Sequence, residues 1–137
     1  MTDDLQLKIM EAVAKLKNYP MSARKMRLVI DNIRGKRIGE ALNILRYTKK
    51  EAADVCEKVL LSAIANWEDK LGHTESADDY NLVVSTAYVD QGYQLKRFRP
   101  APHGRAHRIR KHTCHVNIAV SNTKELERSA VDNQEEE

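Results

Sequence analysis

The feature that most constrains this chain is a run of thirty-four consecutive residues, Gln91 to Lys124, that contains neither Asp nor Glu. Its large apolar side chains, Leu95, Phe98 and Ile109, are too sparse to offset the charge repulsion and the entropy cost of ordering the run in water. The cations surround a turn containing Pro and Gly, and they are Lys96, Arg97, Arg99, Arg105, Arg108, Arg110 and Lys111. We therefore expect this segment to require a polyanionic partner.

The net charge of +3 hides this concentration of positive charge. Residues 1–90 contain fourteen Lys and Arg and fourteen Asp and Glu, so this part is neutral. Residues 91–124 contain eight basic residues and no acid, whereas residues 125–137 contain one basic residue and six acids. Positive charge concentrated on a single element is typical of a nucleic-acid-binding protein.

The length of 137 residues, with 42% hydrophobic composition, is enough for one hydrophobic core and too little for two. We predict a single domain over residues 11–121, in which a hairpin extension occupies about 90–115. Residues 1–10 are expected to form an N-terminal extension. Residues 122–137 are expected to form an acidic, disordered tail, because they have no apolar periodicity to bury.

Several features indicate a cytoplasmic protein. The two cysteines, Cys56 and Cys114, lie in unrelated contexts, so the sequence indicates no disulfide framework and no metal-binding pair. No apolar run reaches the roughly 18 residues of a membrane span, and Asp3 and Asp4 are unlike the basic start of a signal peptide. We expect no membrane partner and no cofactor.

Hydrophobic spacing predicts two short helices in the first half of the chain. The first follows Ser22 as N-cap and ends at Gly35, with Met26, Val29, Ile30 and Ile33 on its buried side. Its outward side carries Arg24, Lys25, Arg27 and Arg34, which suit either an ordinary solvated surface or contact with an anion. The second helix is predicted from Ile38 to Arg46.

A third, longer helix has the clearest pattern in the chain. It is expected to begin with Thr48 and Glu51 as a T-x-x-E capping box and to end at Gly72. We expect Cys56 and Trp67 to lie in the core, because a buried free Cys packs as a small hydrophobe and Trp contributes a large apolar area. The stripe comprises Ala52, Val55, Cys56, Val59, Leu60, Ala63, Ile64, Trp67 and Leu71.

Alternating apolar residues predict strands over residues 12–17, 82–89 and 116–120. The last two are predicted to form the base of an antiparallel hairpin whose arms meet near Pro100 to Gly104. An arm of about a dozen residues at roughly 3.4 Å each extends about 40 Å, beyond the thickness of the domain. The predicted fold class is therefore α+β with a long basic β-hairpin projecting from the domain.

The predicted hairpin is basic on both faces, because Arg108 and Arg110 share one strand parity and Lys111 has the other. A protein that reads a duplex usually presents one basic face, so two basic faces favour burial inside folded RNA. The rings of Tyr93 and Phe98 have two interpretations. They either stack on bases or pack across the ribbon.

Zinc binding and catalysis are two alternatives to RNA binding. A zinc site is not expected, because on an extended strand His112 and Cys114 face away from His115 and the spacing of these residues with His103 and His107 matches no zinc finger. An enzyme is not expected either. The basic run has no carboxylates to hold Mg²⁺, and the chain has no P-loop, GxSxG or HExxH motif.

The alternative interpretation is an architectural DNA-binding protein that inserts a Pro-tipped β-arm into the minor groove. Such arms usually come in pairs from an intertwined dimer. This chain instead has a self-contained core with no spare apolar helix face. RNA is therefore favoured, and no DNA partner is expected.

A family resemblance is carried by seven motifs: Ser22-Ala-Arg-Lys-Met-Arg-Leu-Val29, Ile30 to Lys36, Ser62 to Asn66, Ala87 to Gly92, Leu95 to Pro100, Gly104 to Ala106 and Arg108 to His115. In order and spacing they resemble the bacterial large ribosomal subunit protein 22 family over about Ala12 to Ser121. The resemblance implies three helices packed on a small three-stranded antiparallel sheet. It also implies a structural protein that binds 23S rRNA, contacts neighbouring large-subunit proteins and aids subunit assembly.

The resemblance further implies that the hairpin passes through rRNA and that its tip lines the nascent-peptide tunnel near the macrolide site. The tip residues that would meet the nascent peptide are Leu95, Lys96, Arg97, Arg99, Pro100, Ala101, Pro102, His103, Gly104 and Arg105. The expected rRNA contacts are Arg24, Lys25, Arg27, Arg34, Lys36, Arg37, Tyr93, Lys96, Arg97, Phe98, Arg99, Arg105, His107, Arg108, Arg110, Lys111 and His112. Compared with the family, Ala101, Pro102 and His103 make the tip stiffer and less cationic.

Overall fold

The computed structural model describes residues 10–72 and 81–122. Most of the predicted N-terminal extension, the polar loop after Gly72 and nearly all of the acidic tail lie outside the described residues. The elements, in chain order, are β1 (Glu11–Tyr19), α1 (Ala23–Ile33), α2 (Ile38–Tyr47), α3 (Glu51–Lys70), β2 (Leu82–Pro100), the short 3-10 helix η2 (Pro102–Gly104) and β3 (Ala106–Asn122).

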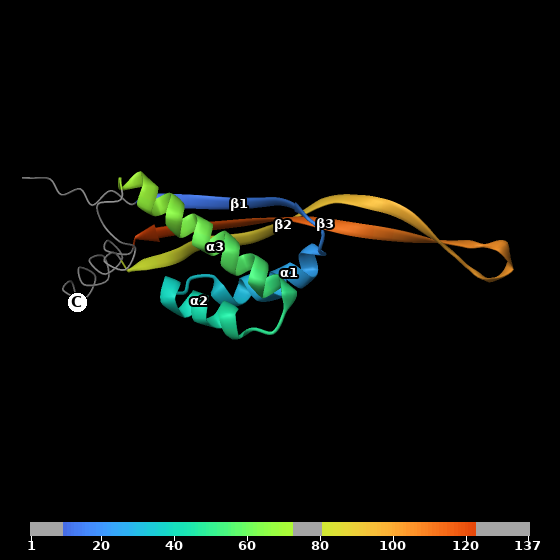
Figure 1. Ribbon diagram of the computed structural model, residues 1–137, viewed down its shortest axis with the longest axis horizontal. Helices are drawn as coiled ribbons and strands as arrows, with labels where there is room; N and C mark the ends of the chain where they lie inside the picture. The colour runs from blue at the N-terminus through green and yellow to red at the C-terminus, as the bar shows by residue number, and fades with distance from the viewer. Residues whose placement is uncertain (1–9, 73–80, 123–137) are drawn as a thin grey trace, which may run out of the picture.

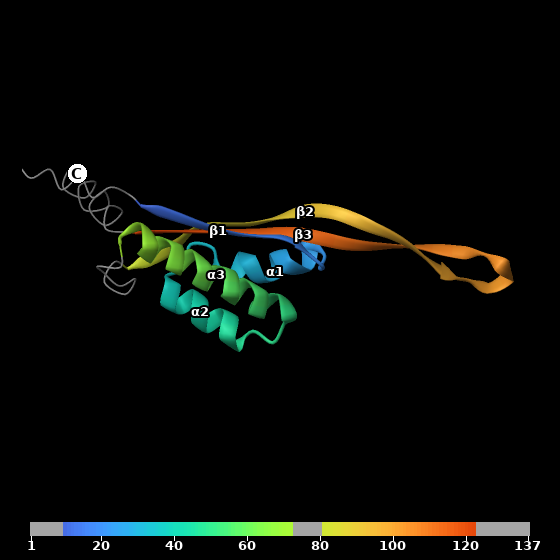
Figure 2. The same ribbon diagram turned by 45° about the horizontal axis from the view of Figure 1, so that its top comes forward.

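The strands form one antiparallel sheet in the order β1-β3-β2, so β3 is central and pairs with both neighbours. The three helices cover one face of the sheet, as Figure 2 shows. Beyond the helices, β2 and β3 continue as a long two-stranded ribbon (Figure 1). The predicted α+β fold with a projecting hairpin is confirmed.

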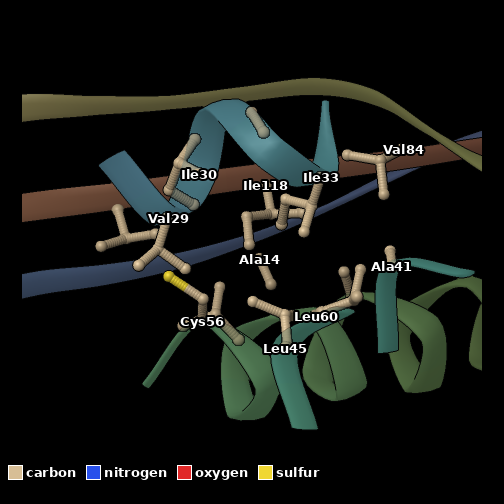
Figure 3. Packing of buried hydrophobic residues seen from close by; sticks show 14 of the residues in the cluster. Ala14, Val29, Ile30, Ile33, Ala41, Leu45, Cys56, Leu60, Val84 and Ile118 are labelled. Carbon is tan, nitrogen blue, oxygen red and sulfur yellow. The ribbon is translucent and has the colours of Figure 1, made fainter. Parts of the chain in front are cut away.

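The core lies between the sheet and the helices, where alternating strand residues meet the apolar stripes (Figure 3). Ala12 and Ala14 of β1 are buried, as are Val116, Ile118 and Val120 of β3. The small side chains of β1 lie under α3, the helix with which that strand makes most of its helix contacts. The alternating burial of β1 agrees with the strand predicted over residues 12–17, whereas the central strand β3 is buried at every position from Thr113 to Val120 except His115.

The apolar stripe of α3 forms the centre of the core, with Cys56, Leu60 and Trp67 all fully buried. The Cys56 thiol lies 3.5 Å from the sulfur of Met26 on α1. Burial raises the pKa of the Cys56 thiol to about 12, so the thiol is neutral at physiological pH and packs as a small hydrophobe. The predicted core positions of Cys56 and Trp67 are confirmed.

The predicted capping box at the start of the third helix is wrong. Thr48 instead closes α2, because its hydroxyl donates to the carbonyl of Ile44 at 2.6 Å and its N–H donates to the same oxygen at 3.1 Å. The residue that precedes α3 is Lys50, and its side chain makes no capping hydrogen bond. Thr48 and Lys50 are both extended at the backbone, which separates the two helices.

Side chains from two helices close the free edges of the sheet. On β2, Arg34 donates two hydrogen bonds to the carbonyl of Ala87 (3.0 and 2.9 Å), and Arg27 donates two to Val89 (3.1 and 2.9 Å). On β1, the carbonyls of Val13 and Glu11 accept from Asn66 (3.1 Å) and Lys70 (2.5 Å) of α3, respectively. Edge strands expose unpaired backbone groups, so these bonds protect the sheet and fix both helices against it.

A β-bulge marks the point where the ribbon leaves the body. One extra residue lies on β2 between the pairs Gln91↔Cys114 and Gln94↔His112. At Gly92 a Cβ atom would lie 2.4 Å from the Oγ1 of Thr113, and the Thr113 hydroxyl donates to the carbonyl of Tyr93 at 2.7 Å. A side chain at position 92 would displace the Thr113 hydroxyl from this hydrogen bond, so the bulge favours glycine there.

We predict that Leu60→Ala destabilises the fold by about 2–5 kcal/mol, because it removes a fully buried side chain from the centre of the core. Leu61→Ala is the matched control, since Leu61 is 44% exposed and its truncation should change stability by about 0.5 kcal/mol or less. Urea unfolding followed by circular dichroism measures both. Equal effects of the two substitutions would contradict the assignment of the α3 stripe.

We also predict that the body folds without the ribbon. Replacing residues 96–110 by Asn-Gly joins Leu95 and Lys111, which are already register partners, through a two-residue turn. The melting temperature should change by less than about 5 °C, because the removed residues contribute no buried core side chain. A much lower melting temperature would show that the ribbon is part of the folding unit.

Candidate nucleic-acid interface

Every residue of the ribbon from Tyr93 to His112 is exposed or half-exposed. Residues directly opposite each other on paired strands share one face of a sheet. One face therefore carries the pairs Lys96↔Arg110 and Phe98↔Arg108. The other face carries Leu95↔Lys111, Arg97↔Ile109 and Arg99↔His107. The prediction of a hairpin with cations on both faces is confirmed.

Lys96 and Arg110 are like charges held directly opposite each other, an arrangement that destabilises an isolated ribbon. Among the described residues, both ion pairs lie on the body, at Arg34 with Asp31 (3.0 Å) and Arg46 with Glu57 (3.0 Å). The ribbon's cations are thus available to an external anion. A shallow groove of about 300 Å³ on the ribbon is lined by Lys96, Arg97, Phe98, Arg108, Ile109 and Arg110.

The two aromatic residues of the ribbon are largely uncovered, with Tyr93 56% and Phe98 71% exposed. Phe98 lies opposite Arg108 and between cationic neighbours, where its face is accessible to a nucleobase. The two interpretations of these rings, stacking on bases and packing across the ribbon, both stay predictions.

The tip is a compact turn. Pro102 begins η2, and His103 and Gly104 follow with positive φ values of 62° and 69°. The N–H of Ala101 donates to the carbonyl of Arg105 at 2.8 Å and closes the turn. Glycine adopts positive φ without strain, so Gly104 supports the reversal of direction that the Pro/Gly pattern predicted.

The candidate metal ligands are spread along the molecule. His103 lies at the tip and His107 pairs with Arg99 near it, whereas Cys114 is fully buried in the body. Nδ1 of His115 accepts a hydrogen bond from the N–H of Asn18 at 3.0 Å. Within residues 10–72 and 81–122, no three His, Cys, Asp or Glu side chains are grouped as metal ligands.

The basic side of α1 divides into two pairs. Arg24 and Lys25 are exposed in the first turn. Arg27 and Arg34 direct two donors each at the carbonyls of β2, so only part of each guanidinium is available to a phosphate. Sequence reasoning missed this positioning role, because nothing in the spacing indicates which strand edge α1 will face.

Lys36 and Arg37, two further residues expected to contact rRNA, lie just after α1 beside the start of β2. The carbonyl of Lys36 accepts from the N–H of Val84 at 3.0 Å, and Arg37 forms an isolated bridge with Val83. Both side chains are exposed. They therefore lie on the body at a distance from the ribbon, and do not join its basic surface.

The structure brings Lys25 of α1 and Lys111 and His112 of β3 together with Lys50, which the sequence analysis did not single out. These residues line an open groove of about 800 Å³, which we call the α1–α3 groove. In the sequence, the adjacent lysines Lys49 and Lys50 lie just before the third helix, and this pair could have indicated a basic site there. The rest of the lining is Pro20, Met21, Ser22, Leu28, Glu51 and Ala52.

No helix in the described part of the chain is long and apolar enough to cross a membrane.

Comparison with known proteins agrees with this geometry. The model of the family "Ribosomal protein L22p/L17e" matches residues 14–121. The chain is 54% identical over 115 residues to "Large ribosomal subunit protein uL22" of Flavobacterium johnsoniae, covering 82% of this chain and 83% of that relative. It is 50% identical over 118 residues to the protein of the same name from Flavobacterium psychrophilum, covering 84% and 85%. The family resemblance drawn from the sequence motifs is confirmed. The chain belongs to the ribosomal protein L22p/L17e family, whose members are structural constituents of the large ribosomal subunit and not enzymes.

Proposed function

We propose that this chain binds 23S rRNA through both faces of the ribbon and helps to fold the rRNA during assembly of the large subunit. The tip of the ribbon would line the nascent-peptide tunnel near the macrolide site. The relatives named above are large-subunit proteins, and bacterial large subunits are cytoplasmic. Neighbouring large-subunit proteins are the expected protein partners of the body.

The observation that carries this proposal is the pairing of like charges along an exposed ribbon. Lys96 opposite Arg110 costs free energy unless an anion lies close to both, and the ribbon itself contains no acid. Phosphates of folded RNA supply that anion on either face. A single-faced duplex contact would leave half of the ribbon's cations unpaired.

The separation of body and ribbon supports a role in assembly. The eight residues of β2 from Tyr93 to Pro100 extend past the bulge at Gly92, and at roughly 3.3 Å each they reach about 26 Å from the body. An element of this length contacts rRNA segments that are far apart from those beneath the body.

The acidic tail over 122–137 is proposed to stay outside the RNA, since phosphates repel its charge.

We predict that Arg108→Gln with Arg110→Gln weakens binding to 23S rRNA and lowers the slope of log K against log salt by roughly 1.5, because each lost phosphate contact accounts for about 0.7–0.9. Lys49→Gln with Lys58→Gln is the matched control, with the same change in charge on exposed or half-exposed positions of the body. Filter binding between 50 and 300 mM KCl measures both. Equal slopes for the two double variants would argue against the ribbon as the main contact.

We predict that a photo-crosslinking amino acid at position 103 reacts with the nascent peptide in stalled ribosomes, because the tip would form part of the tunnel wall. The same amino acid at position 47 is the control, since Tyr47 is 84% exposed on the body. Denaturing gels of a radiolabelled nascent chain measure the crosslink. A crosslink from position 47 and none from position 103 would place the tip outside the tunnel.

A further inference from the structure

The α1–α3 groove lies where the ribbon joins the body and combines two kinds of surface. Lys25, Lys50 and Lys111 come from α1, the residue before α3 and β3, so three segments far apart in sequence contribute a lysine to the lining of one groove. The carboxylate in the lining, Glu51, accepts a hydrogen bond from the Tyr19 hydroxyl at 3.2 Å. The groove therefore carries an excess of positive charge.

Part of the lining of the groove is apolar, and we call Pro20, Met21 and Leu28 its apolar floor. Leu28 is 57% exposed on α1, although the helix has a well-buried inner face. At about 800 Å³, the groove falls in the range of roughly 300–1,000 Å³ typical of sites for small organic ligands. A phosphate alone would use the lysines and leave the apolar floor exposed to water.

We propose that the α1–α3 groove holds one unpaired nucleotide of the rRNA, with its phosphate at Lys25, Lys50 and Lys111 and its base on Leu28 and Met21. An A-form duplex keeps its bases stacked inside and cannot reach an apolar floor with a base, whereas single-stranded loops and bulges can. The excess of lysine disfavours a basic protein tail as the occupant. This inference rests on the proposed rRNA binding and adds a second contact, on the body.

The test uses the full-length chain and 23S rRNA. Leu28→Ala should weaken binding roughly five- to tenfold, because it removes apolar contact with the base, whereas Leu61→Ala should have no effect. Lys50→Gln should lower the salt slope by about 0.7, the value for one single-stranded phosphate contact, and Lys49→Gln should leave it unchanged. Both groove positions are exposed enough that the fold should tolerate them, and thermal unfolding checks this.

Chemical probing of the rRNA supplies a second measurement. Wild-type protein should protect an unpaired base that becomes reactive again with Leu28→Ala and stays protected with Leu61→Ala. If Lys50→Gln and Leu28→Ala bind like wild type while Arg108→Gln with Arg110→Gln is weakened, the groove proposal is overturned and the ribbon proposal stands. If protection is confined to paired bases, or only the lysine variant is affected, the nucleotide pocket is likewise overturned. If every variant binds alike, the proposed function itself fails.

Discussion

The structure depends on the hydrogen-bonded ladder between β2 and β3, which begins in the core, passes the bulge at Gly92 and runs to the tip. The inner part of the ladder is buried under three helices, with Val84, Ala87 and Val89 facing the core. That burial stabilises the base of the hairpin without any contribution from the outer ribbon. The outer part, with Lys96 opposite Arg110, would be unfavourable as an isolated peptide, because a lone two-stranded hairpin is marginal even without charge repulsion.

Hydrogen bonds from side chains at both edges help to stabilise this small sheet. Three strands leave two open edges, and these are closed by side chains of α1 and α3 instead of by further strands. Arg27 and Arg34 therefore have a structural task that limits their part in phosphate contact. The bulge at Gly92 then separates the protected inner sheet from the exposed ribbon, and the Thr113 hydroxyl occupies the space that a side chain at position 92 would need.

Much of the fold was predictable, because buried residues follow the periods of helix and strand closely. The stripe of α3 from Ala52 to Trp67 and the alternation of β1 are cases where local pattern and tertiary burial agree. Thr48 is the case where they differ. Its hydroxyl could have accepted a hydrogen bond from a backbone N–H at the start of α3 or donated one to a carbonyl at the end of α2. Because the backbone is extended at Lys50, only the carbonyl of Ile44 lies within reach.

The sequence by itself determined that a basic, acid-free hairpin would project from the domain, and that helices and strands would share one core. Both follow from composition and periodicity, which are local properties of the chain. Only the tertiary structure decided which cations are free and which are used internally, because that depends on the strand edge beside each helix. Only the tertiary structure gathers Lys25, Lys50 and Lys111 into one groove, since the three positions are separated by long stretches of chain and become neighbours through packing alone.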